Sequence, residues 1–173
     1  VDLRDRLAAH GVVPPLPDGW RVETALRSAH REAFSGDFVV TATRAGGTVL
    51  EIALVDVSGK GQDAGVRSLQ LSGALAGLIG QLPTAEFLPA ANAYLLAQDW
   101  DEGFATAVHV SLVLATGEYA VVSAGHLPPV HLHAGSGRVE LVHPGGGPAL
   151  GVVAGAVFAA VTGRLDRGDT LLL

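Results

Sequence analysis

Two aspartates stand at the ends of apolar stretches, where their charges need a compensating partner. Asp37 opens the segment "GDFVV", and Asp56 closes the segment "IALVD". If residues 44–47 form the turn between the two stretches, both carboxylates reach the same end of one hairpin. Like charges held close together repel unless a cation separates them, and carboxylate oxygens suit Mg²⁺ or Mn²⁺. The spacing is equally compatible with a structural role for both residues, in which Asp37 caps the end of its strand and Asp56 supports the following turn.

The glycines that follow Asp56, in "VSGKG", do not form a nucleotide-binding motif. A phosphate-binding loop has four residues between its first glycine and Gly-Lys, and then serine or threonine. Here Leu54 occupies the first glycine position and Gly61 follows Lys60. The dinucleotide pattern also fails, because Gly65 comes one residue too late. These glycines instead indicate backbone that lies close to another group.

Two histidines form a second candidate metal site. His131 and His133 alternate along a predicted strand, so both side chains point to one face. Gly125 precedes His131 at the spacing of a cupin-like metal motif, but Glu140 lies too far along the chain to serve as its acidic ligand. We therefore interpret the two histidines as polar residues on an exposed strand face, with a cupin-like metal enzyme as the alternative.

Hydrophobic periodicity predicts a hairpin, a helical pair and a series of antiparallel strands. Leucines and isoleucine on one face predict a helix after Gly61, and a second helix is expected from Thr84 to about Trp100. A short helix is expected over residues 1–10. Strands are expected at residues 20–30, 37–44, 48–57, 104–117 and 118–125, with a hairpin at 129–143 and two strands within 155–173. This order predicts an α+β fold, with helices packed on antiparallel sheet.

Composition narrows the possible partners. The chain has 173 residues, and its 11 basic and 17 acidic residues give a net charge of −6, which argues against nucleic acid. It contains no cysteine, which excludes disulfides and thiolate metal sites. No apolar run is long enough to span a bilayer, so we expect a cytoplasmic domain without membrane contact.

The sequence resembles the bacterial metal-dependent phosphatases related to protein phosphatase 2C, in the branch of stage II sporulation protein E. The resemblance begins near Trp20 and continues to the end of the chain. Its motifs are "SGDFVV" (35–40), "LVDVSGKGQDAG" (54–65), "LPAANAYLL" (88–96), "FATAV" (104–108), "SAGHLPPV" (123–130) and "RGDTLLL" (167–173). We therefore expect residues 1–19 to be a linker or regulatory helix and residues 20–173 to form the phosphatase domain.

The resemblance implies a four-layer αββα sandwich with two Mg²⁺ or Mn²⁺ ions where the sheets meet. The family's bridging aspartate falls on Asp56, its carbonyl ligand on Val57, and its first acidic residue on Asp37. The resemblance also implies that no side chain attacks the substrate and that a water activated by the metals would be the nucleophile. Ser58, Gly59 and His126 are expected to support the site from the loops around it, His126 structurally rather than catalytically.

The family's pattern also places two further metal-binding aspartates beyond "GDTLLL", where this chain ends. We expect the domain to be incomplete at its C-terminus and poorly active or inactive by itself, with an exposed sheet edge that favours a homodimer. The implied function is hydrolysis of phosphoserine or phosphothreonine in a protein substrate, such as a phosphorylated anti-sigma-factor antagonist. The alternative is a pseudophosphatase that binds a signalling partner without catalysis.

Overall fold

Antiparallel pairing organises all the strands of the chain that the structure describes. The computed structural model describes residues 7, 9–25, 36–59, 61–98, 100 and 103–173. The elements are β1 (Phe38–Arg44), the 3-10 turn η1 (Ala45–Gly47), β2 (Val49–Val57), α2 (Gly61–Leu78), α3 (Thr84–Leu96), β3 (Ala105–Val113), β4 (Glu118–Ala124), β5 (Val130–Leu132), β6 (Val139–Leu141), β7 (Ala160–Arg164) and β8 (Thr170–Leu172).

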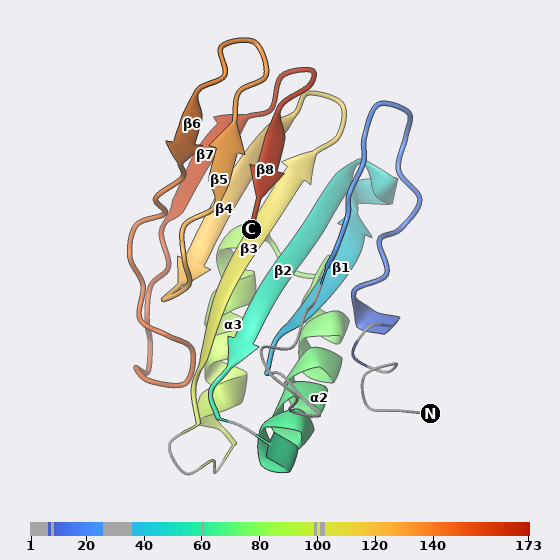
Figure 1. Ribbon diagram of the computed structural model, residues 1–173. Helices are drawn as coiled ribbons and strands as arrows, with labels where there is room; N and C mark the ends of the chain where they lie inside the picture. The colour runs from blue at the N-terminus through green and yellow to red at the C-terminus, as the bar shows by residue number, and fades with distance from the viewer. Residues whose placement is uncertain (1–6, 8, 26–35, 60, 99, 101–102) are drawn as a thin grey trace.

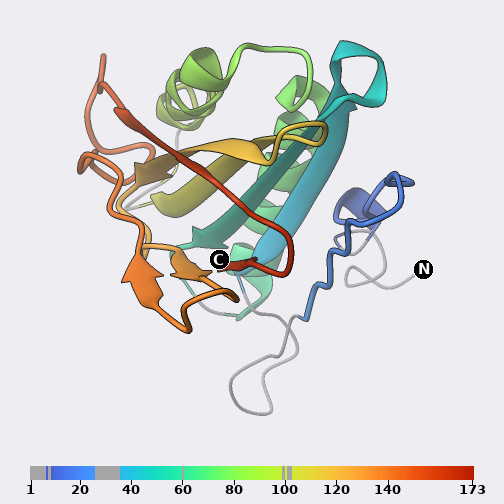
Figure 2. The ribbon, with the colours of Figure 1, turned by 90° about the horizontal axis from the view of Figure 1, so that it is seen from above.

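The strands form two sheets, and the helices lie on one side of the larger one (Figure 1). Sheet A has the order β1-β2-β3-β4-β7, and sheet B has the order β6-β5-β8. Viewed from above, sheet A separates α2 and α3 from sheet B (Figure 2). The predicted α+β class with two antiparallel sheets is confirmed. The outer helical layer on sheet B, which the resemblance implies, is not seen among the described residues.

The first hairpin forms as predicted because its turn residues adopt backbone conformations that reverse the chain. Ala45, Gly46 and Gly47 all have positive φ angles, of 53°, 69° and 90°. Left-handed backbone of this kind is accessible to glycine at little cost. The resulting register pairs Phe38 with Val55 and Arg44 with Val49.

The helices bury their apolar faces against sheet A, with α2 packed on β1 and β2 and α3 packed on β3 and β4. Leu71 and Leu75 of α2 and Leu88 of α3 are completely buried, as are Val40 and Val55 of the sheet. The predicted apolar face of α2 is therefore confirmed. Burial of a leucine-sized side chain contributes about 1.5–3 kcal/mol, so this layer is a main source of rigidity for the strand ends.

The opposite face of sheet A packs against sheet B and against the N-terminal segment. Buried residues of β3 and β4, including Val108 and Val121, form a second cluster with Leu171 of β8 and with Trp20. The indole nitrogen of Trp20 also donates to the carbonyl of Leu114, at 2.9 Å. The strand predicted at 20–30 is wrong for residues 20–25, which have no regular structure, and residues 26–35 lie outside the described part.

Three other boundary predictions have different outcomes. The second helix ends at Leu96 and not near Trp100. Of the helix expected over residues 1–10, residues 7, 9 and 10 are helical and the others lie outside the described residues. The division between residues 19 and 20 stays a prediction. Among the described residues, no helix combines the length and apolar character needed to cross a membrane.

A buried ionic cluster lies on the helix-facing side of sheet A. The Glu51 carboxylate is 1% exposed and accepts bonds from Arg44 Nε at 2.8 Å and Ser111 Oγ at 3.1 Å. It also lies 2.8 Å from His109 Nε2. Burial alone raises the pKa of Glu51, but the hydrogen bonds and charges of His109 and Arg44 outweigh it and lower the pKa below its usual 4.5.

Candidate metal centre

The hairpin register brings the two predicted aspartates together. Phe38 pairs with Val55, so continuing the same register places Asp37 opposite Asp56 and Gly36 opposite Val57. The backbone agrees, because the Val57 amide donates to the Gly36 carbonyl at 3.4 Å. Asp56 is exposed and Asp37 is half-buried, at the lower end of β2 in Figure 1, where α2 also begins.

The electrostatics of this pair favour a cation between the two carboxylates. Burial raises the pKa of Asp37, and the negative charge of Asp56 and a hydrogen bond with its side chain raise the pKa further. A divalent ion with oxygen ligands would relieve this repulsion, because it interacts favourably with both ionised groups. The donor set therefore fits Mg²⁺ or Mn²⁺, and binding of either ion by these residues stays a prediction.

The Val57 carbonyl, the third predicted ligand, lies against a glycine. A Cβ added to Gly36 would come within 2.2 Å of the Val57 oxygen and 3.2 Å of its carbonyl carbon. Real Cβ atoms essentially never approach this closely, so only glycine fits without a backbone shift. The Val57 side chain is 2% exposed and packs into the core, which fixes the peptide from its other side.

Ser58 and Gly59 shape the loop that leaves Asp56. The Ser58 amide donates to the Phe104 carbonyl, and Ser58 Oγ accepts from the Phe104 amide, both at 2.9 Å. These two hydrogen bonds hold the loop against the residue that precedes β3. Gly59 has a φ of +108°, and a Cβ at that position would lie 3.9 Å from the Arg67 guanidinium. Ser58 thus anchors the loop, while Gly59 supplies the turn.

His126 is connected to the aspartates through β3. Asp56 pairs with Thr106 in the β2–β3 register, and Thr106 Oγ1 lies 2.7 Å from His126 Nδ1. The Ser123 hydroxyl accepts from the His126 amide at 3.2 Å. Burial lowers the pKa of His126, and the nearby charge of Asp56 opposes that shift. These contacts link His126 to the strand beside Asp56, and its supporting role at the site stays a prediction.

The sequence analysis did not single out three residues that the fold brings to this end of the sheet. Gly36 and Thr106 stand beside the predicted ligands, and strand pairing could have found them once the register was known. Arg67 belongs to α2, where its guanidinium carbon lies 5.6 Å from the centre of the Trp100 ring. Its place beside Gly59 depends on how α2 docks, and no local pattern signals it.

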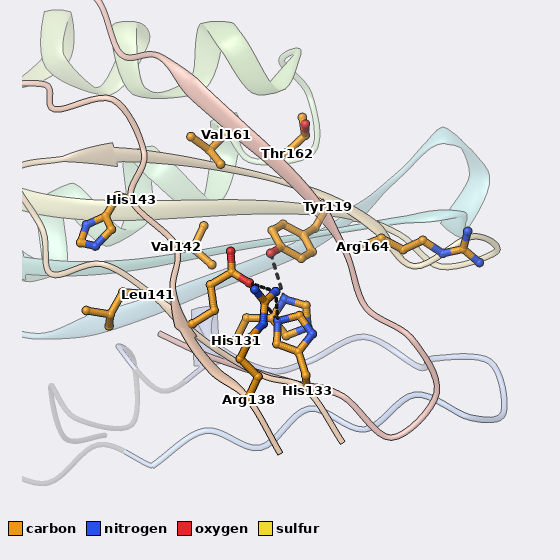
Figure 3. A pocket seen from close by; sticks show the side chains of 12 residues that line it. Tyr119, His131, His133, Arg138, Leu141, Val142, His143, Val161, Thr162 and Arg164 are labelled. Atoms are coloured by element: carbon orange, nitrogen blue, oxygen red, sulfur yellow. Dashed lines mark hydrogen bonds and ion pairs between the residues drawn. The ribbon is translucent and has the colours of Figure 1, made fainter. Parts of the chain in front are cut away.

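The second candidate site lies in sheet B, and the structure revises its interpretation (Figure 3). His131 and His133 share one face, as predicted, with ring centres 3.8 Å apart. The prediction that these histidines lie on an exposed strand face is wrong for His131, which is 2% exposed. Glu140 is not too far away, because the β5–β6 hairpin places it 2.9 Å from His133 Nε2. Sequence distance was misleading here, since the turn between the two strands folds the chain back.

The two antiparallel sheets with their two helices form a fold like that of protein phosphatase 2C domains. The family model described as Stage II sporulation protein E (SpoIIE) matches residues 46–173, and the chain belongs to this family. The comparison with curated protein sequences found no match.

Three solved structures show the same fold. The RsbU and RsbW domains of Rv1364c from Mycobacterium tuberculosis match with a TM-score of 0.71 and 28% identity, covering 83% of this chain and 39% of that one. The PP2C phosphatase domain of SpoIIE from Bacillus subtilis matches with a TM-score of 0.66 and 18% identity, covering 79% of this chain and 40% of that one. RsbX in complex with magnesium matches with a TM-score of 0.60 and 17% identity, covering 82% of this chain and 66% of that one. The chain thus spans about two-fifths of the first two structures.

Proposed function

We propose that the chain is part of a metal-dependent phosphatase that hydrolyses phosphoserine or phosphothreonine in a protein substrate. The observation that carries the proposal is the placement of Asp37 opposite Asp56 at the end of the β1–β2 hairpin. The raised pKa of Asp37 supports it, because burial and the charge of Asp56 both oppose ionisation in the absence of a cation. Family membership supplies the reaction class.

Asp37, Asp56 and the Val57 carbonyl would hold Mg²⁺ or Mn²⁺. Such ions acidify water and neutralise charge on a phosphoryl group, which is the chemistry that phosphate ester hydrolysis needs. The match to RsbX, which was solved with magnesium, supports the choice of a divalent ion. The pairing of Asp56 with Thr106 fixes the strand end that carries the carboxylate.

The protein's own side chains would orient the substrate. Arg67 offers a guanidinium beside the glycine loop, and guanidinium groups bind phosphoryl oxygens through paired N–H donors. Its guanidinium carbon lies 5.6 Å from the Trp100 ring centre, within the range of a cation–π contact. His126 would position Thr106, and through it the end of β2, rather than contact the reacting atoms.

A phosphorylated anti-sigma-factor antagonist is the substrate that we propose. The matched Mycobacterium tuberculosis structure combines an RsbU domain with an RsbW domain, which supports a place in sigma-factor regulation. The net charge of −6 argues against a nucleic-acid substrate. Binding of the phosphoprotein without turnover would instead support the pseudophosphatase alternative. The homodimer stays a prediction.

The test is Mn²⁺-dependent hydrolysis of p-nitrophenyl phosphate by the complete gene product. Asp56→Asn should abolish activity and weaken Mn²⁺ binding while circular dichroism stays unchanged. Asp166→Asn is the matched control, because this aspartate is 79% exposed and its carboxylate contacts only Arg164 among the described residues. His126→Ala should reduce activity less than Asp56→Asn. Activity retained in Asp56→Asn would refute the assignment.

A further inference from the structure

The β5–β6 hairpin gathers metal-binding side chains that the phosphatase reaction does not use. One ring nitrogen each from His131 and His133 and one oxygen of Glu140 all lie within 4.8 Å of one another. These residues also line a cavity of about 270 Å³, whose lining includes neither Asp37 nor Asp56. The cluster is therefore a separate feature, on sheet B and the adjoining edge of sheet A.

We propose that His131, His133 and Glu140 form a binding site for a transition-metal ion of the Zn²⁺ type. Two imidazoles and a carboxylate are typical ligands of Zn²⁺, whereas Mg²⁺ prefers a set made only of oxygens. Ligands of a tetrahedral ion with bonds of about 2.1 Å lie roughly 3.4 Å apart, so the three side chains need only a small contraction. The side chains of His133 and Glu140 are 22% and 43% exposed, so they have room to move closer to the ion.

The His131 ring is already held by partners at both nitrogens. Tyr119 Oη lies 3.2 Å from Nδ1, and Asp169 Oδ2 lies 2.9 Å from Nε2. Whichever nitrogen turns to the ion, the other keeps a partner that orients the ring, as is usual for metal-bound histidines. Asp169 is itself fixed, because it accepts bonds from the amides of Ala134 and Asp166. Its Oδ2 is also 3.8 Å from His133 Nδ1, so Asp169 lies close to both histidine rings.

A cation already stands in the cluster. The Arg138 guanidinium lies 3.0 Å from His133 Nε2 and donates to the Glu140 carboxylate (Figure 3). A guanidinium only donates hydrogen bonds, so this neighbour is compatible with a His133 Nε2 that presents its lone pair, which is the form that a metal requires. The Arg138 side chain is 62% exposed and can leave without disturbing the core. Arg138 thus occupies the place of the metal and competes with it.

The backbone fixes these side chains independently of any ligand. His131 pairs with Glu140 across β5 and β6, and paired residues of antiparallel strands point to the same face. The His133 amide donates to the Arg138 carbonyl at 2.9 Å, which closes the turn between the strands. A bound ion would therefore staple the hairpin, and through Asp169 the β7–β8 turn, to each other.

Zn²⁺ titration by calorimetry tests the site in the Asp37→Asn/Asp56→Asn background, where the candidate phosphatase centre is disabled. We expect one Zn²⁺ per chain, with affinity lowered at least ~10-fold by His133→Ala and by Glu140→Gln. Both residues are partly exposed, so these variants should keep the fold, as circular dichroism would show. Arg138→Gln should raise the affinity, while Arg164→Gln, a matched change at the cavity wall, should not.

Co²⁺ substitution adds a spectroscopic readout, since a tetrahedral site with two histidines gives intense visible absorption that an octahedral oxygen site lacks. Absence of Zn²⁺ binding in the double-variant background, or unchanged affinity in His133→Ala and Glu140→Gln, would overturn the site. Unchanged affinity in Arg138→Gln would overturn the role of Arg138 as the competing cation. Neither result depends on phosphatase activity, so the two proposals succeed or fail separately.

Discussion

Replacing Gly36 by alanine tests whether the Val57 carbonyl must stay where the fold places it. The new Cβ would lie 2.2 Å from the Val57 oxygen, whereas ordinary van der Waals contact begins at 3.4 Å. The backbone fixes the position of the Cβ, and the Val57 oxygen is itself a backbone atom, so the overlap must be relieved by separating the two strand ends that carry Asp37 and Asp56. Overpacking of this kind costs about 1–3 kcal/mol of stability. A displacement near 1 Å at a reacting centre can cost ~100-fold in rate.

The assay compares Mn²⁺ affinity by calorimetry with the rate of p-nitrophenyl phosphate hydrolysis in the complete gene product. We expect Gly36→Ala to lower both, with kcat/KM falling about 100-fold while the free energy of unfolding falls by only about 1–3 kcal/mol. Gly73→Ala is the control, since an added Cβ there meets nothing within 4 Å and α2 should gain about 0.5–1 kcal/mol. Wild-type Mn²⁺ affinity in Gly36→Ala would refute the reasoning.

Two further predictions concern stability. The pKa of Glu51 in the folded protein lies below its usual 4.5. Its ionised carboxylate therefore contributes fully to the free energy of unfolding above that pH, and the contribution is lost as the pH falls through the folded pKa. In urea unfolding, Glu51→Gln should therefore cost about 1–3 kcal/mol at neutral pH and progressively less in acid, and an unchanged pH slope would contradict this. Asn92→Ala should cost a similar amount, because the buried amide bonds the Val153 carbonyl at 2.9 Å and the Gly151 amide at 2.8 Å. Gln98→Ala, which loses a single hydrogen bond of 3.3 Å, should cost less in the same urea unfolding experiment, and equal losses would argue against this account.

The meeting of Asp37 and Asp56 was predictable because the information is local. A glycine-rich turn fixes the register of a hairpin, and the register fixes which residues stand opposite each other. The apolar face of α2 was predictable for a similar reason, since helical periodicity can be recognised within a short stretch of sequence. Even so, the sequence could not place Arg67 beside Gly59, because that contact depends on how the helix docks on the sheet.

The histidine cluster shows where linear spacing fails. His131 and His133 were correctly placed on one face, because strand alternation is local. The burial of His131 follows from the packing of sheet B on sheet A, where Tyr119 meets its ring. Asp169 comes from a distant turn. No spacing rule joins residues that come together only when two sheets close over one another.

The sheets also differ in how their strands are joined along the chain, and this bears on how the molecule folds. In sheet A, β1 to β4 are neighbours in sequence order, and β2 and β3 each run for 9 residues. In sheet B each strand has 3 residues. Its central strand β5 pairs with β8, which comes after β7 in the sequence, so this pairing closes a long loop. Loop closure of that kind is slow, so we expect sheet A to nucleate folding and sheet B to assemble last. Amide hydrogens of β5 and β8 should accordingly exchange with solvent before those of β2 and β3, through openings far smaller than global unfolding.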